Sequence, residues 1–330
     1  MRHPLSPLDD PALVLEIATA DNFDADRYLI ANPDIAAWAR HGGDPRFHLD
    51  SHGIAEGRKQ IGRAFHDTLR ARRRAKYAHF AGIFDPARGA GGAFAFLEEP
   101  GAFPIGYGGA AHSLSDYDGE SAHGGLGQYD DEIAANPDRL YLDIGCGLRP
   151  DMFDNCLYVE VYPSRSADLV MAPACTYPIA DTSVDGIGCF AVMEHMTEPW
   201  IAAAEFRRML KPGGLLFVDW PFLQPVHGYP SHYYNATREG VRRMFDDGFE
   251  IVDLDTRPNQ TPERTLLWLL RGWIDGLTDD SVRTELRGKT VDELLALSPR
   301  SPFWKSVNAA TPPAVRETYA AGNTLVARRL

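Results

Sequence analysis

Near the middle of the chain, a short apolar stretch leads directly into two closely spaced glycines. Residues 141–144 form the stretch, Asp143 stands near its end, and Gly145 and Gly147 follow on either side of Cys146. Because glycine carries no Cβ, its backbone can bend sharply and approach a ligand closely. Open α/β sheets bind their ligands beyond the carboxyl ends of the strands. The pattern therefore predicts a buried strand that ends in a ligand-binding turn.

A second acidic residue, Glu160, stands near the end of the next apolar stretch, residues 157–161. A carboxylate at such a strand end can accept hydrogen bonds from both hydroxyls of a ribose. The dinucleotide fingerprint requires a third glycine where this chain has Pro150, and no Gly-Lys-Ser/Thr sequence follows to make a phosphate-binding loop. The remaining interpretation is a different nucleoside cofactor, S-adenosylmethionine.

Three further motifs follow the glycine turn in a fixed order. Residues 181–190 lead to Glu194-His195, and residues 205–214 end in Leu-Lys-Pro-Gly-Gly before an apolar stretch, residues 215–219. Together with the turn, this order resembles the class I S-adenosylmethionine-dependent methyltransferases of the type 11 kind. The resemblance implies an α/β fold with a Rossmann-like seven-stranded sheet and S-adenosylmethionine as the cofactor. It also implies a cofactor-binding role for these residues: Asp143, Gly145, Cys146, Gly147, Glu160 and Glu194.

The chain departs from that family at two places around the expected cofactor. Arg149 stands where many members carry a third glycine. Ala-Pro at residues 172–173 occupies the end of the third strand, where members often place an Asp that reads the adenine amino group, and Asp168 opens that strand instead. Cys175, Thr176 or a backbone group would then substitute for the missing Asp. These departures leave open a degenerate domain that does not act as an enzyme.

Three histidines lie on segments expected near the transferred methyl group. His195 belongs to the Glu-His motif, and His227 and His232 lie in a loop rich in proline and tyrosine after the fifth strand. Methyl transfer from a sulfonium is an in-line displacement, for which positioning can contribute about 7–11 kcal/mol. A hydroxyl acceptor also needs its proton removed, and histidine can act as that base at neutral pH. We expect these histidines to act as the base or to position the acceptor.

The composition argues against several other classes of function. The net charge of −13 argues against a nucleic-acid partner. No apolar run reaches transmembrane length, and the N-terminus shows no apolar region of a secretory signal. The cysteines have no metal-ligand spacing, so reduced thiols in a cytoplasmic protein are expected: Cys146, Cys156, Cys175 and Cys189. The spacing of His227, His232 and Glu194 also matches no metal-ligand pattern, and no metal is expected.

The first part of the chain, residues 1–62, is predicted to form a small all-α module. Asn32-Pro33 and Asp44-Pro45 are typical helix starts, with the Asn or Asp as the cap and proline in the first turn. The module resembles one that accompanies bacterial surface-glycan enzymes and secreted proteins. The resemblance indicates a packing or docking role, with a partner bound through this module.

Two further parts complete the predicted organisation. Residues 63–128 are expected to contain a basic helix, whose basic residues form a solvated face, followed by a Gly-rich linker or cover. Residues 129–330 would form the methyltransferase domain. Within it, strands are expected at residues 249–254 and 323–328, with a helical insertion at about 262–305 between them. The core face of this insertion is expected to comprise Leu266, Leu267, Leu269 and Leu270.

The leading hypothesis is S-adenosylmethionine-dependent methyl transfer to a small-molecule or glycan-linked acceptor, with oxygen as the favoured atom. The glycan link comes from the loop around His227, which resembles that of a methyltransferase subgroup often encoded with polysaccharide machinery. The alternative is a non-catalytic scaffold that docks onto glycan-assembly enzymes. A nicotinamide oxidoreductase is a third interpretation, which Pro150 and the Leu-Lys-Pro-Gly-Gly turn weaken.

Overall fold

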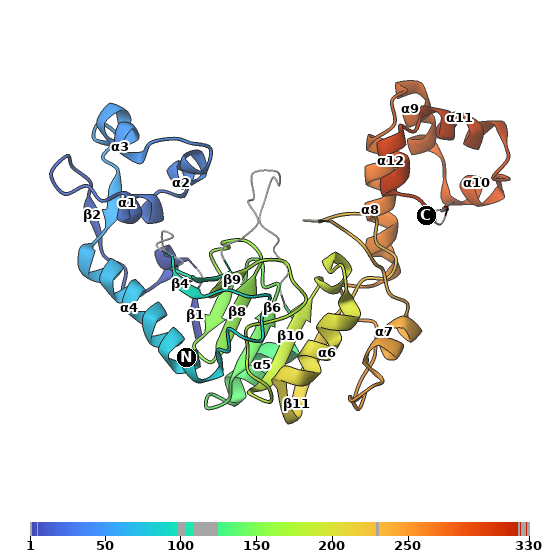
Figure 1. Ribbon diagram of the computed structural model, residues 1–330. Coiled ribbons are helices and arrows are strands. Elements are labelled where there is room, and N and C mark those ends of the chain that lie inside the picture. Colours follow the sequence, from blue (N-terminus) through green and yellow to red (C-terminus); the bar gives the residue numbers. More distant parts are fainter. Residues whose placement is uncertain are drawn as a thin grey trace. The chain divides into compact units, whose positions relative to one another are not determined.

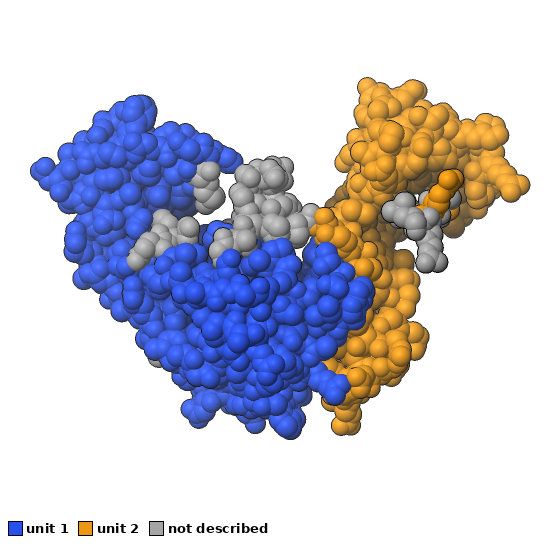
Figure 2. All heavy atoms as spheres, in the orientation of Figure 1, with its two compact units in different colours: residues 1–220 blue, residues 221–330 orange. Residues whose placement is uncertain are grey.

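The computed structural model describes residues 2–4, 6–97, 103–108, 125–228, 231–322, 324 and 328. The chain divides into two compact units, Met1–Trp220 and Pro221–Leu330, which are coloured blue and orange in Figure 2. Each unit is described by itself below. None of the helices among the described residues is long and apolar enough to span a membrane.

The first unit begins with the predicted N-terminal module, which is mainly helical. Its helices are α1 (Ala25–Ala31), α2 (Pro33–Arg40) and α3 (Pro45–His48), followed by a π-helical turn, Leu49–Gly53. It also contains a two-stranded antiparallel sheet that was not predicted, β2 (Leu15–Ile17) with β3 (Lys59–Ile61).

The helix starts of this module follow the predicted pattern in part. Asp44 caps α3 as expected, because its side chain accepts from the Arg46 N–H. Asn32 precedes α2 but does not cap it with its side chain. Its amide instead donates to the carbonyls of Tyr28 and Lys59, which ties α1 to β3.

A long helix, α4 (Arg63–Phe80), runs from this module to the central sheet (Figure 1). Its basic run was expected to be a solvated face, but part of it is buried against the sheet. Lys76 donates to the fully buried carboxylate of Asp168 at 2.6 Å, and Arg73 pairs with the same carboxylate. The Tyr158 N–H also donates to Asp168, at 3.0 Å. These contacts fasten α4 to the sheet, because a buried carboxylate requires such partners.

The central sheet has seven strands in the order β11-β10-β6-β8-β9-β5-β4. Its strand pairs are parallel except for the antiparallel pair at the β4 edge. This confirms the predicted Rossmann-like α/β architecture. The strands are β4 (Phe94–Phe96), β5 (Ile105–Tyr107), β6 (Tyr141–Ile144), β8 (Cys156–Glu160), β9 (Leu169–Met171), β10 (Val184–Phe190) and β11 (Leu210–Asp219).

The strands of this sheet are not all the ones that the sequence predicted. β4 and β5 come from the segment expected to be a linker or cover. The strand expected at residues 249–254 is absent: that segment has no regular structure, and Val252 is 84% exposed. Most of the strand expected at residues 323–328 lies outside the described residues.

Helices α5 (Gly127–Ala135) and α6 (Pro199–Met209) complete the first unit, with short 3-10 turns at Pro7–Asp9, Ala81–Ile83 and Met193–His195. β1 (Arg2–Pro4) pairs with β7 (Asp151–Phe153) in a separate two-stranded sheet. Helix α5 packs its apolar side on the sheet, and the Tyr129 hydroxyl donates to the Leu142 carbonyl at 2.5 Å. The core cluster at this contact comprises Tyr129, Ile133, Tyr141, Cys146, Met152, Phe153, Cys156, Tyr158 and Phe190.

The second unit is helical, as predicted for about 262–305, and the helices continue to Thr318. It contains α7 (Arg238–Phe245), α8 (Pro262–Asp275), α9 (Asp280–Gly288), α10 (Val291–Ala296), α11 (Pro302–Ala310) and α12 (Pro313–Thr318). Leu266 and Leu267 were expected in its core but are 55% and 45% exposed. The core lies instead between α8, α9 and α11, around Leu277, Val282, Leu286, Val307 and Ala310.

Candidate active site

The glycine turn follows β6 as predicted and needs glycine at both positions. Gly145 and Gly147 have φ angles of +66° and +53°, which residues with a side chain rarely adopt. A Cβ on Gly145 would lie 2.3 Å from a side-chain carbon of Val192. Cys146 is fully buried between them, and burial raises the pKa of its thiol. Cys146 is therefore a neutral packing residue that contributes its backbone to the turn.

Glu160 lies at the end of β8, beside this turn. Ile144 of β6 pairs with Val159 of β8, so the two strand ends meet at one edge of the sheet. The Gly147 N–H donates to Glu160 Oε2 at 2.7 Å, and the Val161 N–H donates to Oε1 at 2.7 Å. Burial raises the pKa of Glu160 to about 7. A carboxylate offers about four acceptor positions, so this one retains acceptor capacity for two ribose hydroxyls.

Asp143, the acid before the turn, forms a buried pair with Arg149. The guanidinium donates from Nε to Oδ2 at 2.7 Å and from Nη2 to Oδ1 at 2.9 Å. Asp143 is 3% and Arg149 5% exposed. Burial opposes the charge of Arg149, but the adjacent carboxylate outweighs this effect and holds the pKa of Arg149 above its usual value. The predicted contact of Asp143 with the cofactor stays a prediction, and the structure gives this acid a cationic partner.

The end of β9 carries no acid that could read an adenine amino group, as the sequence indicated. Ala172 and Pro173 follow this strand directly. Asp168 precedes β9 and is engaged by α4, as described above. Cys175 is half-buried, and burial raises the pKa of its thiol, so it is a neutral group at pH 7. That Cys175, Thr176 or a backbone group reads the adenine stays a prediction.

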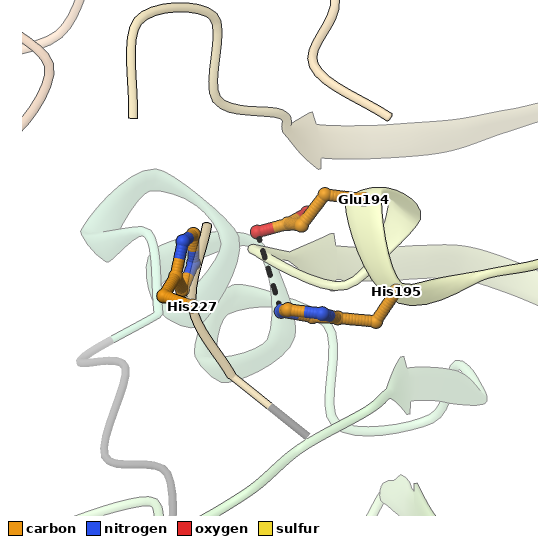
Figure 3. A group of neighbouring side chains, drawn as sticks. All are labelled: Glu194, His195 and His227. Atoms are coloured by element: carbon orange, nitrogen blue, oxygen red, sulfur yellow. Dashed lines mark ion pairs between the residues drawn. The ribbon is translucent and has the colours of Figure 1, made fainter. Parts of the chain in front are cut away.

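Glu194 and His195 lie on the 3-10 turn that follows β10 (Figure 3). The side chain of Glu194 is fully buried, and that of His195 is 14% exposed. His195 Nε2 lies 3.8 Å from Glu194 Oε1, the contact that is dashed in Figure 3. Burial, together with the nearby charge of Asp219, raises the pKa of Glu194 to about 8. Glu194 is therefore mostly protonated at pH 7, and a protonated carboxyl group can donate a hydrogen bond.

His227, which Figure 3 also draws, and His232 belong to the second unit, where they contact each other. Their Nδ1 atoms are 3.1 Å apart, and their rings meet edge to face with centroids 4.6 Å apart. His227 Nδ1 lies 2.8 Å from the Pro225 carbonyl, and His232 Nε2 lies 2.9 Å from Asn235 Oδ1. Burial lowers the pKa of His227, and the neighbouring His232 lowers it further.

These contacts assign the protons on the two rings. A carbonyl oxygen accepts, so His227 carries its proton on Nδ1 and His232 carries its proton on Nε2. The acceptor nitrogen of neutral His227 is then Nε2, and that of His232 is Nδ1, which faces His227. A lowered pKa keeps His227 neutral at pH 7, which is the state that a general base requires.

Sequence reasoning missed three contributors to this site. Arg149 was noted only as a departure from the family, whereas it neutralises Asp143. Ser164 and Ser166 were not singled out, yet the Ser164 hydroxyl donates to the Gly147 carbonyl at 2.5 Å and the Arg149 N–H donates to Ser166 Oγ at 2.8 Å. A positive charge that follows a buried strand acid was the available signal for Arg149. The serines gave none, because isolated hydroxyls in a loop are common.

Comparisons with known proteins agree with this geometry. Residues 142–218 match a family described as "Methyltransferase domain". The chain is similar to proteins named uncharacterized methyltransferase from Mycobacterium bovis and Mycobacterium tuberculosis, each 32% identical over 106 residues, which is 31% of this chain and 42% of the relative. A relative of the same name from Mycolicibacterium gilvum is 32% identical over 100 residues, 29% of this chain and 39% of the relative. The chain thus spans about two fifths of the length of these relatives, and residues 142–218 include the glycine turn, Glu160 and Glu194-His195.

Proposed function

We propose that this protein is an S-adenosylmethionine-dependent methyltransferase that acts on a small-molecule or glycan-linked acceptor, with oxygen as the methylated atom. The observation that carries the proposal is the edge where β6 and β8 end. There the Gly147 N–H and the Glu160 carboxylate are joined by a 2.7 Å hydrogen bond directly beyond a parallel strand pair. Ligands of open α/β sheets bind at such strand ends.

The hydrogen-bonding groups at this edge fit the proposed cofactor. A carboxylate suits the two hydroxyls of a ribose, and a glycine turn lets a ligand approach the backbone. Glu194 would lie beside the methionine end of the cofactor, because it follows the adjacent strand β10. The cofactor would supply a methyl group on a sulfonium, which makes that methyl electrophilic.

The remaining chemistry falls to histidine. A hydroxyl acceptor must lose its proton, and a base whose pKa lies near the working pH accelerates this roughly 10²–10⁴-fold. His195, His227 and His232 are the proposed bases or acceptor-positioning groups. Of the pair in the second unit, His227 is the better placed base, because its acceptor nitrogen is Nε2, whereas the acceptor nitrogen of His232, Nδ1, faces His227. No metal is assigned a role in this scheme.

The glycan link and the docking partner belong to the same proposal and rest on resemblance alone. The N-terminal module resembles modules found beside surface-glycan enzymes, and the loop that holds His227 resembles that of glycan-associated methyltransferases. A cytoplasmic location would suit the four unpaired cysteines, because disulfides are rare in that compartment.

Calorimetric titration with S-adenosylhomocysteine tests the cofactor site without knowledge of the acceptor. We expect wild-type binding in the micromolar range and a loss of at least about tenfold in Glu160→Gln, because the amide offers only one acceptor oxygen and no charge. Glu317→Gln is the control, since Glu317 is an exposed glutamate of α12. Wild-type protein that binds nothing at millimolar ligand would refute the enzyme and leave the non-catalytic scaffold.

The scaffold alternative is favoured by one observation, the missing acid at the end of β9. It predicts a partner that binds the N-terminal module whether or not the methyltransferase sheet binds a cofactor. An oxidoreductase predicts binding of NAD(H) in place of S-adenosylhomocysteine. The same titration with NADH therefore separates the two enzyme classes.

A further inference from the structure

We propose that Arg149 is a positioning residue of the cofactor site. It holds Asp143 and closes the glycine turn, so that the Gly147 N–H and Glu160 keep the arrangement that receives the cofactor. The inference rests on the proposed function and goes beyond it, because it assigns a role to the residue that replaces the family's third glycine.

The first support is the geometry of the pair. Arg149 comes six residues after Asp143 in the sequence and grips its carboxylate with two parallel hydrogen bonds of 2.7 and 2.9 Å. Both side chains are at least 95% buried. A two-pronged contact fixes orientation as well as distance, which a single hydrogen bond would not do. The chain between the two residues is the glycine turn itself, so the pair clamps its two ends.

The second support is that the same turn is fastened at its backbone. The Arg149 N–H donates to Ser166 Oγ at 2.8 Å, and the Ser164 hydroxyl donates to the Gly147 carbonyl at 2.5 Å. The Gly147 N–H donates to Glu160. Side-chain and backbone contacts of one short loop thus connect both acids of the site, and a displaced Arg149 would move the Gly147 N–H.

The third support is the charge that Arg149 supplies. A glycine at this position would leave the Asp143 carboxylate buried without that cation, which is costly for a charge removed from water. The guanidinium also lies 5.8 Å from the centre of the Phe190 ring at the end of β10, an arrangement that favours a cation. Arg149 therefore links the ends of three strands: β6 through Asp143, β8 through the turn, and β10 through Phe190.

The test uses Arg149→Lys and the double variant Arg149→Met/Asp143→Asn. Lysine keeps the charge but cannot make the two-pronged contact. The double variant removes both charges and so leaves neither one buried alone, and we expect it to fold for that reason. The control is Arg27→Met, because Arg27 is equally buried, at 2% exposed, and pairs with Glu16 far from this site in the sequence. The readouts are thermal unfolding, amide hydrogen exchange of residues 145–147 without ligand, and the affinity for S-adenosylhomocysteine.

We expect folded Arg149→Lys protein whose amides at residues 145–147 exchange at least about tenfold faster and whose ligand affinity falls about tenfold, the size of one displaced charge-assisted hydrogen bond. The double variant should show the same faster exchange. Arg27→Met should change neither the amide exchange of residues 145–147 nor the ligand affinity. Wild-type exchange and affinity in both Arg149 variants would overturn the proposal. If the wild type itself binds no ligand, the proposed function fails, and the exchange measurement alone decides the role of Arg149.

Discussion

Cofactor affinity should depend on pH through Glu160. Burial raises the pKa of this carboxyl from its ordinary value of 4.5 to about 7, so a large share of ligand-free molecules carry a neutral Glu160 at pH 7. Two ribose hydroxyls are hydrogen-bond donors, and only the ionised carboxylate accepts from both without a competing proton. Binding should therefore select the ionised form and release a proton.

The size of the effect follows from the fraction of ionised Glu160. With a pKa of about 7, that fraction is roughly 0.1 at pH 6 and roughly 0.9 at pH 8, and the apparent dissociation constant scales with its inverse. Affinity should therefore rise about tenfold between these two pH values, equivalent to about 1.4 kcal/mol. Near pH 7 about half a proton should leave for each ligand bound.

Titration calorimetry can measure both quantities. Dissociation constants for S-adenosylhomocysteine would be taken at pH 6, 7 and 8. Proton release would come from repeating the pH 7 titration in two buffers of different ionisation enthalpy. Glu160→Gln is the matched control, because it cannot ionise and should show a flat profile apart from any titration of the ligand. Glu194→Gln separates the second raised carboxyl, whose pKa is about 8.

Two results would refute this reasoning. Equal affinity of the wild type at pH 6 and pH 8, without proton release, would mean that the ligand does not read the charge of Glu160. A tenfold pH effect that persists in Glu160→Gln would place the titrating group elsewhere.

Three further predictions concern the stability of the fold. Gly145→Ala should lower the free energy of unfolding by roughly 1–3 kcal/mol and abolish ligand binding, because φ is +66° and the new Cβ would lie 2.3 Å from the Val192 side chain. Urea denaturation measures the loss. Gly42→Ala is the control for backbone strain alone, because Gly42 has φ +89° and nothing within 4 Å of an added Cβ. Lys76→Met should lower the free energy of unfolding by about 3–5 kcal/mol, because the substitution removes one of the two cations that pair with buried Asp168. Thermal melting followed by circular dichroism measures this loss. The folded pKa of Glu194, about 8, exceeds its unfolded value, so wild-type stability should fall as pH rises from about 4.5 to 8. Glu194→Gln should therefore reduce the fall in melting temperature between pH 6 and pH 9, leaving the part that Glu160 contributes up to its own folded pKa of about 7.

The strands and turns around the candidate site could be predicted because their signals are local. Two glycines after an apolar run require a turn, and both adopt the positive φ that only glycine takes readily. The position of Glu160 at the end of the next strand was also a local signal, because residues 157–159 are apolar and buried and Glu160 is the first acid after them. Thr237 caps α7 as its sequence position predicts, accepting from the Gly240 N–H at 3.0 Å.

The edge of the sheet formed by β5 and β4 could not be predicted, because it depends on tertiary pairing. Residues 94–96 and 105–107 are too short to stand out in a Gly-rich segment, yet parallel pairing of Ile105 with Leu169 brings them into the sheet. Residues 249–254 are mainly apolar with two acidic residues among them, as in many strands, but no neighbour pairs with them in the described residues. Pairing partners far away in the chain, rather than local propensity, decide such cases.

Buried ion pairs explain the two places where the sequence departs from the methyltransferase pattern, Asp168 and Arg149. The basic run on α4 and the displaced Asp168 were separate observations, but Arg73 and Lys76 meet in that one carboxylate. Asp168 is therefore a docking point for a helix that precedes the family-matched residues 142–218, and it is not available to a cofactor. Arg149 likewise gives Asp143 a partner from within the chain. Asp143 and Asp168 are thus each engaged by cationic side chains, whereas Glu160 accepts hydrogen bonds from the Gly147 and Val161 N–H groups, which is why cofactor affinity should follow the protonation of Glu160.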